Sequence, residues 1–171
     1  MILKTQRLVL RPIAGDDAPE LFALLGDPEV MAWWDRPPVL RLAVAQDMIG
    51  EQLDAMGDGL CLYWTVLADG AVIGSCDLSL IDRAAGTAEV GVLFRADRWD
   101  QGFATEAMTA MTGYGFETLK LSRLSARIHA GNGRARRLLI RLGFEMESVL
   151  PGYRLTSGAR VDCERYLLRA R

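Results

Sequence analysis

Residues 87–106 read TAEVGVLFRADRWDQGFATE, and the fold of the chain can be worked out from this stretch. Apolar side chains alternate along its first half, at Val90, Val92 and Phe94, which is typical of a β-strand. A charged connection follows. From Gln101 onward, small and apolar residues recur with a helical period as far as about residue 119. The stretch therefore predicts a strand, a turn that contains glycine, and the start of a helix.

The predicted helix start is suited to an anion. The first turn of a helix carries unpaired N–H groups and the positive end of the helix dipole, so a phosphate is stabilised there. Small residues at Gly102 and Ala104 let a bulky phosphate approach the backbone. The sequence contains neither the nucleoside-triphosphate loop GxxxxGK[ST] nor the dinucleotide loop GxGxxG. The stretch thus predicts a phosphate site of another kind.

Three blocks of the sequence resemble one family. Residues 99–107, WDQGFATEA, resemble the Q/R-x-x-G-x-G/A pyrophosphate loop of the GNAT acetyltransferases, with tryptophan in the Q/R position. The same run is similar to the WGxGYATEA form of the ribosomal-protein N-terminal acetyltransferase (RimJ/RimL-like) branch. Residues 132–144 resemble the family's NxxAxxLYxKxGF, and residues 5–12 resemble that branch's opening TxRLxLRP. With three blocks in this order, the chain is identified as a member of the family.

Composition indicates an ordinary globular domain. The 171 residues suit one domain, expected to span residues 1–171. The net charge of −2 gives no basic field that would attract nucleic acid. No signal-peptide pattern or membrane-length apolar run occurs, so we expect a cytoplasmic protein without a membrane partner. Cys61, Cys76 and Cys163 show no metal or disulfide spacing and are expected to be buried free thiols.

The rest of the chain predicts an α/β (α+β) fold: a central mixed, mostly antiparallel sheet of about seven strands with helices on both faces. The strands on either side of the helix from Gly102 are expected to be parallel, because a helix connects them. Asp69-Gly70 predicts a hairpin turn. Asp17 with Glu20 predicts a capping box for the first helix. The expected strands are 7–13, 60–67, 71–81, 88–94, 121–129, 144–149 and 161–168, and the expected helices are 17–25, a short one from 28, 40–56, 102–119 and 132–142.

The resemblance implies acetyl-CoA as the acetyl donor and no metal. By position in the family motifs, the N–H groups of Gln101–Thr105 hold the pyrophosphate, the predicted strand pairs with the pantetheine arm, and Asn132 bonds to that arm. Arg137 is the candidate for a CoA phosphate, with a solvated basic face as the alternative. The cofactor residues implied in this way are Val92, Leu93, Phe94, Asp100, Gln101, Gly102, Phe103, Ala104, Thr105, Asn132 and Arg137. Asp100 adds negative charge beside the phosphates, which weakens CoA binding unless Arg98 neutralises it.

Attack on a thioester requires a neutral amine, so the chemistry calls for a proton acceptor. At neutral pH a lysine-like amine costs roughly 4–5 kcal/mol to deprotonate, and an α-amine costs about 1 kcal/mol. Glu89, on the predicted central strand, is the best candidate for a base that acts through water; a salt-bridged structural role is the alternative. Asp77 and His129 are weaker candidates. His129 is also a candidate substrate contact, with a structural role at the end of a strand as the alternative.

The resemblance breaks down at the group that protonates the leaving thiolate. The family often has Tyr at the position of Leu139, and this branch has Ser at the position of Ala135. Both positions are apolar here. Because a thiol has a pKa near ~8.5, its thiolate is a tolerable leaving group, and water is a sufficient acid. Tyr153 and Tyr166 are alternative donors.

The sequence therefore predicts an N-acetyltransferase in which a primary amine attacks acetyl-CoA directly in a ternary complex. The acceptor is either a protein N-terminal α-amine or a small-molecule amine. Trp33 and Trp34 are candidate acceptor contacts beside two prolines, with core packing as the alternative. A CoA-binding module of the same fold without transferase activity is the rival hypothesis, and a homodimer is left open.

Overall fold

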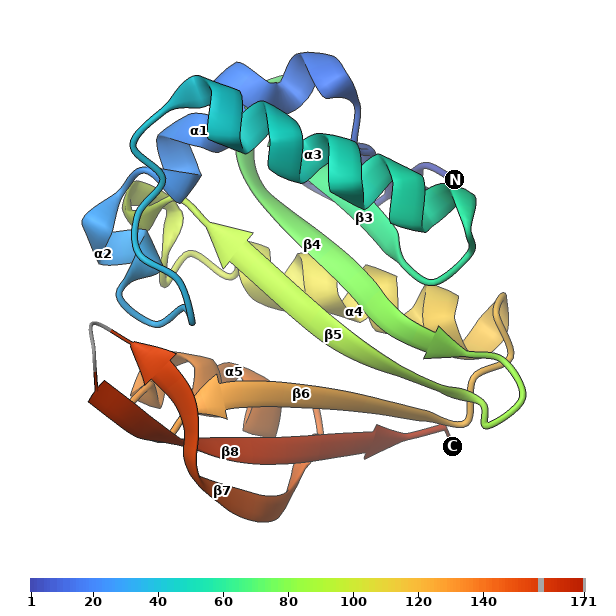
Figure 1. Cartoon of the computed structure of the whole chain (residues 1–171). Helices are drawn as coiled ribbons and strands as arrows, with labels where there is room; N and C mark the ends of the chain where they lie inside the picture. The colour runs from blue at the N-terminus through green and yellow to red at the C-terminus, as the bar shows by residue number, and fades with distance from the viewer. Residues whose placement is uncertain (157–158, 171) are drawn as a thin grey trace.

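The sheet of this computed structural model runs through the whole molecule, and the structure describes residues 1–156 and 159–170. Within these residues, eight strands lie in the order β1-β2-β3-β4-β5-β6-β8-β7 (Figure 1). The strands are β1 (Leu3–Lys4), β2 (Leu8–Pro12), β3 (Leu62–Ala68), β4 (Ala71–Asp82), β5 (Thr87–Phe94), β6 (Arg123–His129), β7 (Glu145–Thr156) and β8 (Ala159–Arg169). The predicted fold class is confirmed, and the additional strand is the short β1.

Helices cover both faces of this sheet, as expected. They are α1 (Ala18–Leu25), α2 (Pro28–Met31), α3 (Leu42–Gly57), α4 (Phe103–Glu117) and α5 (Gly133–Arg141). In Figure 1, α3 crosses in front of β3 and β4, and α4 lies behind the sheet. The larger apolar cluster forms on the α4 side around Trp64, Met111 and Leu124, and a smaller one under α1 and α3 includes Leu21 and Ile49.

One pair of neighbouring strands differs from all the others. β5 and β6 run parallel, as predicted, whereas the other pairs are antiparallel. β5 pairs with β6 only over residues 87–89, yet it stays paired with β4 as far as Phe94. The two strands therefore separate after Glu89 (Figure 1). Within the described chain, one edge of residues 90–94 has no strand partner.

Several turns form as their residues predict. Asp69 and Gly70 have φ values of 50° and 79° at the β3–β4 hairpin, and Gly143 has a φ of 85° after α5.

Cys61, Cys76 and Cys163 are buried free thiols, which confirms the prediction for them. No helix among the described residues has the length and apolar character needed to cross a membrane.

The capping box predicted for Asp17 and Glu20 is wrong. The Asp17 side chain makes no capping bond to α1; it accepts hydrogen bonds from the Ala14 N–H at 2.9 Å and the Thr65 hydroxyl at 2.6 Å. It also forms an ion pair with Arg11. Burial raises the pKa of Asp17, but the bonds from Arg11 and Thr65 outweigh burial and lower it. A tertiary contact between β2, β3 and α1 has replaced the local cap.

The seventh strand is longer than expected. Residues 151–152 were predicted to end it, but β7 continues to Thr156. The register with β8 shifts between Leu150 and Arg154, and Gly152 has a φ of 56°. This irregularity accommodates the proline within the strand. The turn expected at Ser157-Gly158 lies outside the described residues.

Candidate active site

The loop between β5 and α4 places a glycine where only glycine is comfortable. Gly102 has a φ of 82° and a ψ of −2°, in the left-handed region, and α4 begins at the next residue. Its carbonyl accepts the first helical bond, from the N–H of Glu106 at 3.0 Å. A Cβ at this position would lie 3.3 Å from an Arg7 nitrogen. The turn that the sequence predicted is therefore present, and it exposes the first amides of α4.

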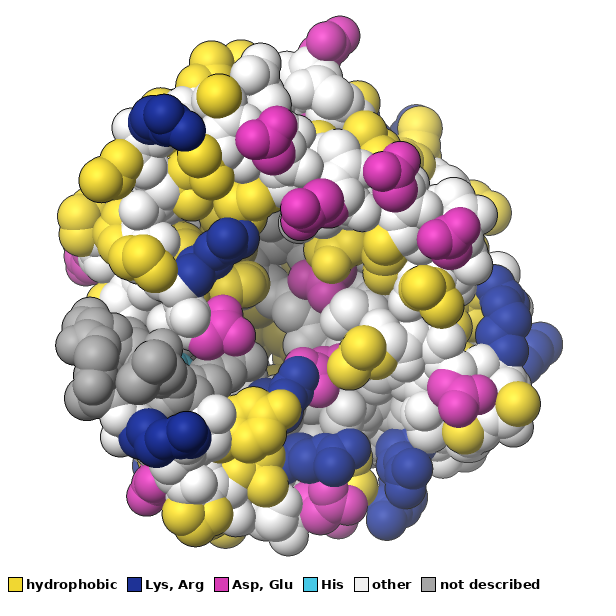
Figure 2. All heavy atoms as spheres, viewed as in Figure 1, with side chains coloured by type: hydrophobic (Ala, Val, Ile, Leu, Met, Phe, Trp, Pro, Cys, Tyr) yellow, Lys and Arg dark blue, Asp and Glu magenta, His cyan; other side chains and the backbone are white. Residues whose placement is uncertain are grey.

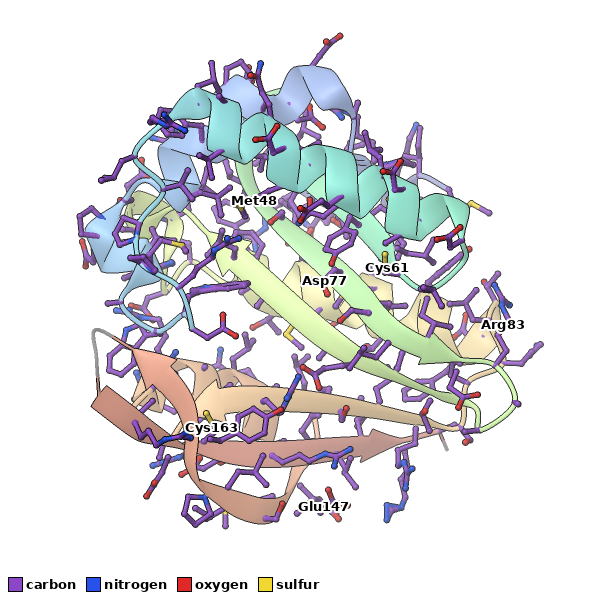
Figure 3. The ribbon with its side chains drawn as sticks, viewed as in Figure 1. Met48, Cys61, Asp77, Arg83, Glu147 and Cys163 are labelled. Atoms are coloured by element: carbon purple, nitrogen blue, oxygen red, sulfur yellow. The ribbon has the colours of Figure 1, made fainter. Side chains whose placement is uncertain are left out.

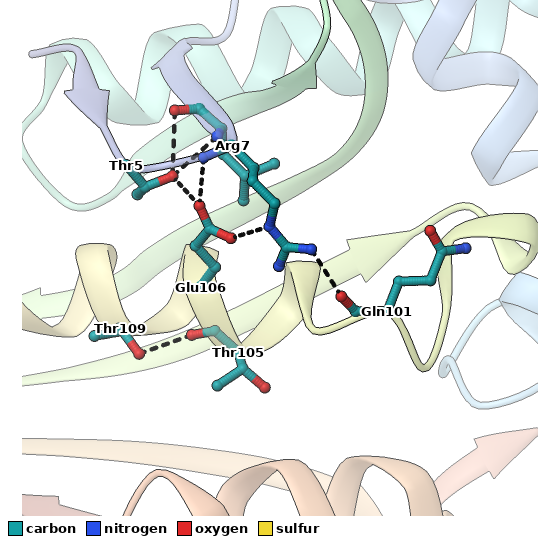
Figure 4. A network of polar contacts seen from close by, with 7 residues as sticks. Thr5, Arg7, Gln101, Thr105, Glu106 and Thr109 are labelled. Atoms are coloured by element: carbon teal, nitrogen blue, oxygen red, sulfur yellow. Dashed lines mark hydrogen bonds and ion pairs between the residues drawn. The ribbon is translucent and has the colours of Figure 1, made fainter.

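A polar network from the N-terminus holds this loop in place (Figure 4). Glu106, in the first turn of α4, accepts hydrogen bonds from the Arg7 backbone N–H at 2.8 Å, from Arg7 Nε at 2.7 Å and from the Thr5 hydroxyl at 2.5 Å. Arg7 Nη1 also donates to the Gln101 carbonyl at 3.0 Å. Because that carbonyl is turned toward Arg7, the opening TxRL block of the sequence acts as a brace for the loop.

A cavity of about 400 Å³ lies over this loop. All the predicted cofactor residues except Gln101 line it, and Gln101 is held at the back by Arg7 and by a bond from its amide to the Asp97 carbonyl at 2.8 Å. The residues that line this cofactor cavity are Val30, Trp33, Trp34, Val92, Leu93, Phe94, Arg98, Trp99, Asp100, Gly102, Phe103, Ala104, Thr105, Asn132, Arg134, Ala135, Arg137, Leu138 and Arg141.

The cofactor cavity is rich in arginine. Arg98, Arg134, Arg137 and Arg141 line it, against the single acidic residue Asp100. Arg98 was the candidate to neutralise Asp100; the ion pair forms with Arg134 instead, whose Nη2 lies 3.3 Å from the carboxylate. The Arg98 Nε is buried and has no hydrogen-bond partner among the described atoms. The surplus of positive charge suits a ligand with several phosphates.

Two side chains fix the ends of this cavity. Trp99, in the Q/R position of the family loop, donates its indole N–H to the Phe94 carbonyl at 2.9 Å and so ties the loop to the end of β5. The Arg134 guanidinium stacks over its ring at 4.3 Å. Asn132 caps α5 as predicted, since its side-chain oxygen accepts from the Ala135 N–H at 3.0 Å.

A second cavity, of about 580 Å³, opens beside the first. Its lining includes α1 and α3 residues, the face of β3–β5 beneath them, and the start of α5. The two cavities share the residues Trp33, Trp34, Val92, Leu93, Asn132, Ala135 and Leu138. They therefore meet where β5 and β6 separate. Figure 2 shows this face hollowed near its centre, with acidic side chains inside and basic ones next to them.

Glu89 lines the second cavity in an ion pair. Its carboxylate accepts from Arg127 Nη2 at 2.7 Å and Nε at 3.0 Å. Arg127 in turn contacts the Tyr153 hydroxyl and lies 5.0 Å from the centre of that ring. The salt-bridged environment that the sequence left open is therefore present, and the role of Glu89 as a base stays a hypothesis.

Asp77 lines the same cavity in different surroundings. It is half-buried on β4 and pairs in register with Gly91 on β5. Burial and, secondarily, the charge of Glu89 raise the pKa of Asp77 to about 7, although a hydrogen bond from Ser79 opposes the shift. Burial and the charge of Asp77 raise the pKa of the nearby Tyr63 to about 12.

The remaining candidate acceptor contacts and proton donors differ in where their side chains lie. Trp33 and Trp34 line both cavities; Trp34 also packs against an apolar cluster, whereas Trp33 is exposed, and their contact with an acceptor stays a prediction. His129 is buried with its ring edge-on to Trp33 at 6.1 Å, and it is outside the lining that the described residues give to the two cavities. Tyr166 is buried and donates to Glu164 at 2.8 Å.

The sequence analysis missed part of the second cavity. Tyr63, Arg36 and Arg127 line it without belonging to a motif. Ser75, Asp77 and Ser79 also line it, and their period of two along a strand was a usable signal for a polar strand face. The described residues contain no group of His, Cys, Asp and Glu that could hold a metal ion.

Comparisons with known proteins agree with this geometry. The model of the acetyltransferase (GNAT) domain matches residues 7–145. The uncharacterized N-acetyltransferase p20 of Bacillus licheniformis is 32% identical over 171 residues, which cover 99% of this chain and 96% of p20. Spermidine N(1)-acetyltransferase of Escherichia coli K12 is 25% identical over 141 residues, covering 82% and 74%.

Two solved structures share the fold. RimL, the ribosomal L7/L12 alpha-N-protein acetyltransferase in complex with coenzyme A, has a TM-score of 0.91 at 17% identity over 99% of this chain and 98% of its own. The Vibrio cholerae spermidine N-acetyltransferase in complex with CoA and spermine has a TM-score of 0.87 at 20% identity, covering 96% of each chain. The chain belongs to the GNAT acetyltransferase family. It is an acetyl-CoA-dependent N-acetyltransferase of that family.

Proposed function

We propose that the protein acetylates a primary amine by direct attack on acetyl-CoA, with the thioester held where the two cavities meet. The observation that carries this proposal is the shared wall of the cavities at Val92, Leu93 and Asn132, beside the separation of β5 and β6. Acetyl-CoA enters from the cofactor cavity and the amine from the second, which we name the acceptor cavity. A ternary complex follows from this arrangement.

The cofactor cavity supplies contacts for each part of CoA. The amides that follow Gly102 take the pyrophosphate at the start of α4. The free edge of β5 at residues 92–94 offers backbone groups to the amides of pantetheine, in the manner of an added strand. Asn132 lies where this arm ends. Arg137 and its neighbouring arginines receive the outer phosphates.

The acceptor cavity suits an ammonium group that must lose a proton. Its polar floor carries Asp77 and Glu89, and its walls carry Trp33, Trp34 and Tyr63. Carboxylates attract the ammonium ion, and aromatic faces stabilise a cation. A carboxylate of this floor takes the proton. Asp77 and Glu89 both line the floor, and Glu89 is the candidate that the sequence named for a base acting through water.

The acceptor is either a protein N-terminal α-amine or a small-molecule amine. RimL, a protein acetyltransferase, and the spermidine enzymes are both among the related proteins. The resemblance of the sequence blocks to the RimJ/RimL-like branch favours the α-amine, whereas the 25% identity to a polyamine enzyme favours a small molecule. An α-amine needs about 3–4 kcal/mol less for deprotonation at neutral pH than a lysine-like amine does.

The leaving thiolate needs no dedicated acid here. Ala135 and Leu139 line the acceptor cavity with apolar groups at the family's acid positions. Tyr166 is committed to Glu164, and Tyr153 lies at Arg127. A thiol with a pKa near ~8.5 leaves readily, so water completes the proton transfer.

The test is release of CoA thiol from acetyl-CoA in the presence of single amines. The panel contains polyamines, amino-acid amides and short peptides with free N-termini, with each peptide matched to its N-acetylated form as a control. Thiol release with one class identifies the acceptor. Tight acetyl-CoA binding with no release from any amine would favour the CoA-binding module instead.

A further inference from the structure

The two carboxylates of the acceptor cavity are not equivalent. Glu89 is bound by two nitrogens of Arg127, and this pair is partly shielded, with side-chain exposures of 17% and 20%. No ion pair reaches Asp77 from the described residues, and it lies opposite Gly91, which has no side chain. The Glu89 carboxylate is therefore already paired with a cation, whereas the Asp77 carboxylate is open to the acceptor cavity.

We propose that Asp77 receives the proton from the acceptor's ammonium group, and that Glu89, fixed by Arg127, attracts and positions that group. This assignment rests on the proposed function and divides the work of the two carboxylates. Asp77 is a catalytic residue in this scheme, because it touches the reacting nitrogen. Glu89 is a positioning residue.

The position of Asp77 beside β5 supports the assignment. Asp77 lies opposite Gly91, and a Cβ at position 91 would overlap the Asp77 carboxylate. The missing side chain thus lets this carboxylate lie over the backbone of β5. The next residues, 92–94, form the edge proposed for pantetheine. Figure 3 shows Asp77 on β4, beneath α3, the helix that carries Met48.

The groups facing Asp77 make it a suitable base. Tyr63 approaches from β3, Glu89 from β5 and Arg127 from β6, and the loop after α2 brings Asp35 and Arg36 to the same cavity. Burial first, and then the charge of Glu89, raise the pKa of Asp77 to about 7. General bases work best when their pKa lies near the working pH. At neutral pH, a substantial fraction of Asp77 is therefore ionised, and its carboxylate is basic enough to accept a proton.

The proposed transfer forms one C–N bond, breaks one C–S bond and moves two protons. A proton moves from the ammonium nitrogen to the Asp77 carboxylate and leaves a neutral amine. The nitrogen lone pair then forms a C–N bond to the thioester carbonyl carbon. The C–S bond breaks as the tetrahedral intermediate collapses, and its electron pair leaves on the CoA sulfur. A second proton passes from nitrogen to that sulfur through water, and Asp77 returns its proton to solvent.

The first test is the pH profile of kcat/KM for wild type and Asp77→Asn with one verified acceptor. Wild type should lose activity as pH falls below about 7, when Asp77 becomes protonated. Asp77→Asn should lower kcat/KM by about 100-fold or more at pH 7. The variant should also lack this acidic limb, the fall in kcat/KM below about pH 7, and keep only the rise in kcat/KM that accompanies deprotonation of the acceptor amine.

Glu89→Gln is the matched variant. Removing the negative charge of Glu89 should move the midpoint of the limb to lower pH, since that charge helps to raise the pKa of Asp77. The KM for the acceptor should rise more than kcat falls. Abolition of the limb in Glu89→Gln, or its survival in Asp77→Asn, would overturn the division of roles.

Stability separates a catalytic Asp77 from a structural one. The pKa of Asp77 is higher in the folded chain than its ordinary value of 3.8, so ionisation destabilises the fold, and stability falls as pH rises from about 4 to about 7. Asp77→Asn should therefore raise the thermal midpoint at pH 8. A lower midpoint with unchanged kinetics would assign Asp77 a structural role, and Asp77→Ser repeats the test if the first variant fails to fold.

The proposed function and this assignment fail in different ways. A wild type that binds acetyl-CoA but acetylates no amine would overturn both. An active wild type whose profile matches that of Asp77→Asn would overturn the assignment alone.

Discussion

The cofactor cavity and the acceptor cavity share a wall but are built in different ways. The cofactor cavity draws most of its lining from two continuous stretches, residues 92–105 and 132–141. In the proposed complex, the backbone amides that follow the left-handed glycine at the start of α4 make the main contacts with CoA. The acceptor cavity collects side chains from four helices and four strands far apart in the sequence. A ligand shared across a family needs a fixed backbone, whereas a variable acceptor is met by side chains.

The largest expected effect lies in the cofactor cavity, at Gly102. Gly102→Val should raise the dissociation constant for CoA by about 100-fold, or about 2.7 kcal/mol, because the side chain blocks phosphate approach. A β-branched residue is also strained at a φ of 82°. Isothermal titration calorimetry on the folded variant measures the change.

Gly70→Val is the matched control for Gly102→Val. Gly70 has a φ of 79° at the β3–β4 hairpin, with open space around it, so the same substitution produces similar strain away from both cavities. The control should lose stability and keep its CoA affinity. Equal affinities in the two variants would remove the phosphate site from this loop.

The next effect concerns the brace behind the cofactor loop. Glu106→Gln should lower the free energy of unfolding by about 1 kcal/mol, because charge-assisted hydrogen bonds to a partly buried carboxylate are lost and solvent screens the exposed Arg7. CoA affinity should fall by a smaller factor, since Arg7 then holds the Gln101 carbonyl less firmly. Denaturant unfolding and calorimetry give the two values.

The pH dependence of stability checks this role of Glu106. Burial raises the pKa of Glu106, but hydrogen bonds from Thr5 and Arg7 outweigh burial and hold it below the ordinary value of 4.5. This contribution to stability is therefore present above about pH 4.5 and is lost as pH falls further. The stability difference between wild type and Glu106→Gln should shrink on acidification. A constant difference would contradict the proposed brace.

The same contrast explains what the sequence could and could not predict. The turn at Gly102, the cap at Asn132 and the parallel pair β5–β6 follow from local rules and were predicted. Arg98 was the candidate partner of Asp100 because it is close in sequence. Asp100 pairs instead with Arg134, which comes from a helix distant in the sequence. The capping box predicted at Asp17 does not form for a similar reason, because Arg11 and Thr65 donate hydrogen bonds to its carboxylate.

The acceptor cavity was the hardest part to predict. Glu89 and Trp33 reach it as expected, but Arg127 and Tyr63 are brought there by pairing between strands that no local pattern specifies. His129, a candidate acceptor contact with a structural role as the alternative, is buried with its ring edge-on to Trp33. Its place at the end of a strand gives no information about which side of the tryptophan it occupies.

A smaller and selective effect is expected in the acceptor cavity. Gly91→Ala adds a methyl group that displaces the Asp77 carboxylate. We expect kcat to fall by about tenfold with acetyl-CoA affinity nearly unchanged, since general-base catalysis depends on placement within hydrogen-bond reach. Gly50→Ala, in α3 with open space around it, is the control that should leave kcat intact. A loss of cofactor affinity without a loss of kcat would contradict the separation of the two cavities.

The smallest effect is expected at Asp100, the acidic residue of the arginine-rich cofactor cavity. Its carboxylate is 68% exposed and 3.3 Å from Arg134, and an exposed pair of this kind is worth about 0.2–1 kcal/mol. Asp100→Asn keeps a side chain that tolerates the local φ of 58° and removes one negative charge beside the phosphates. CoA affinity should therefore rise by up to about fourfold at low salt, and the gain should shrink as salt screens the charges. Arg134→Gln, which leaves Asp100 unpaired, should weaken binding under the same conditions. If Asp100→Asn instead weakens CoA binding at every salt concentration, Asp100 serves to hold Arg134 in position, and orientation outweighs repulsion in this cavity.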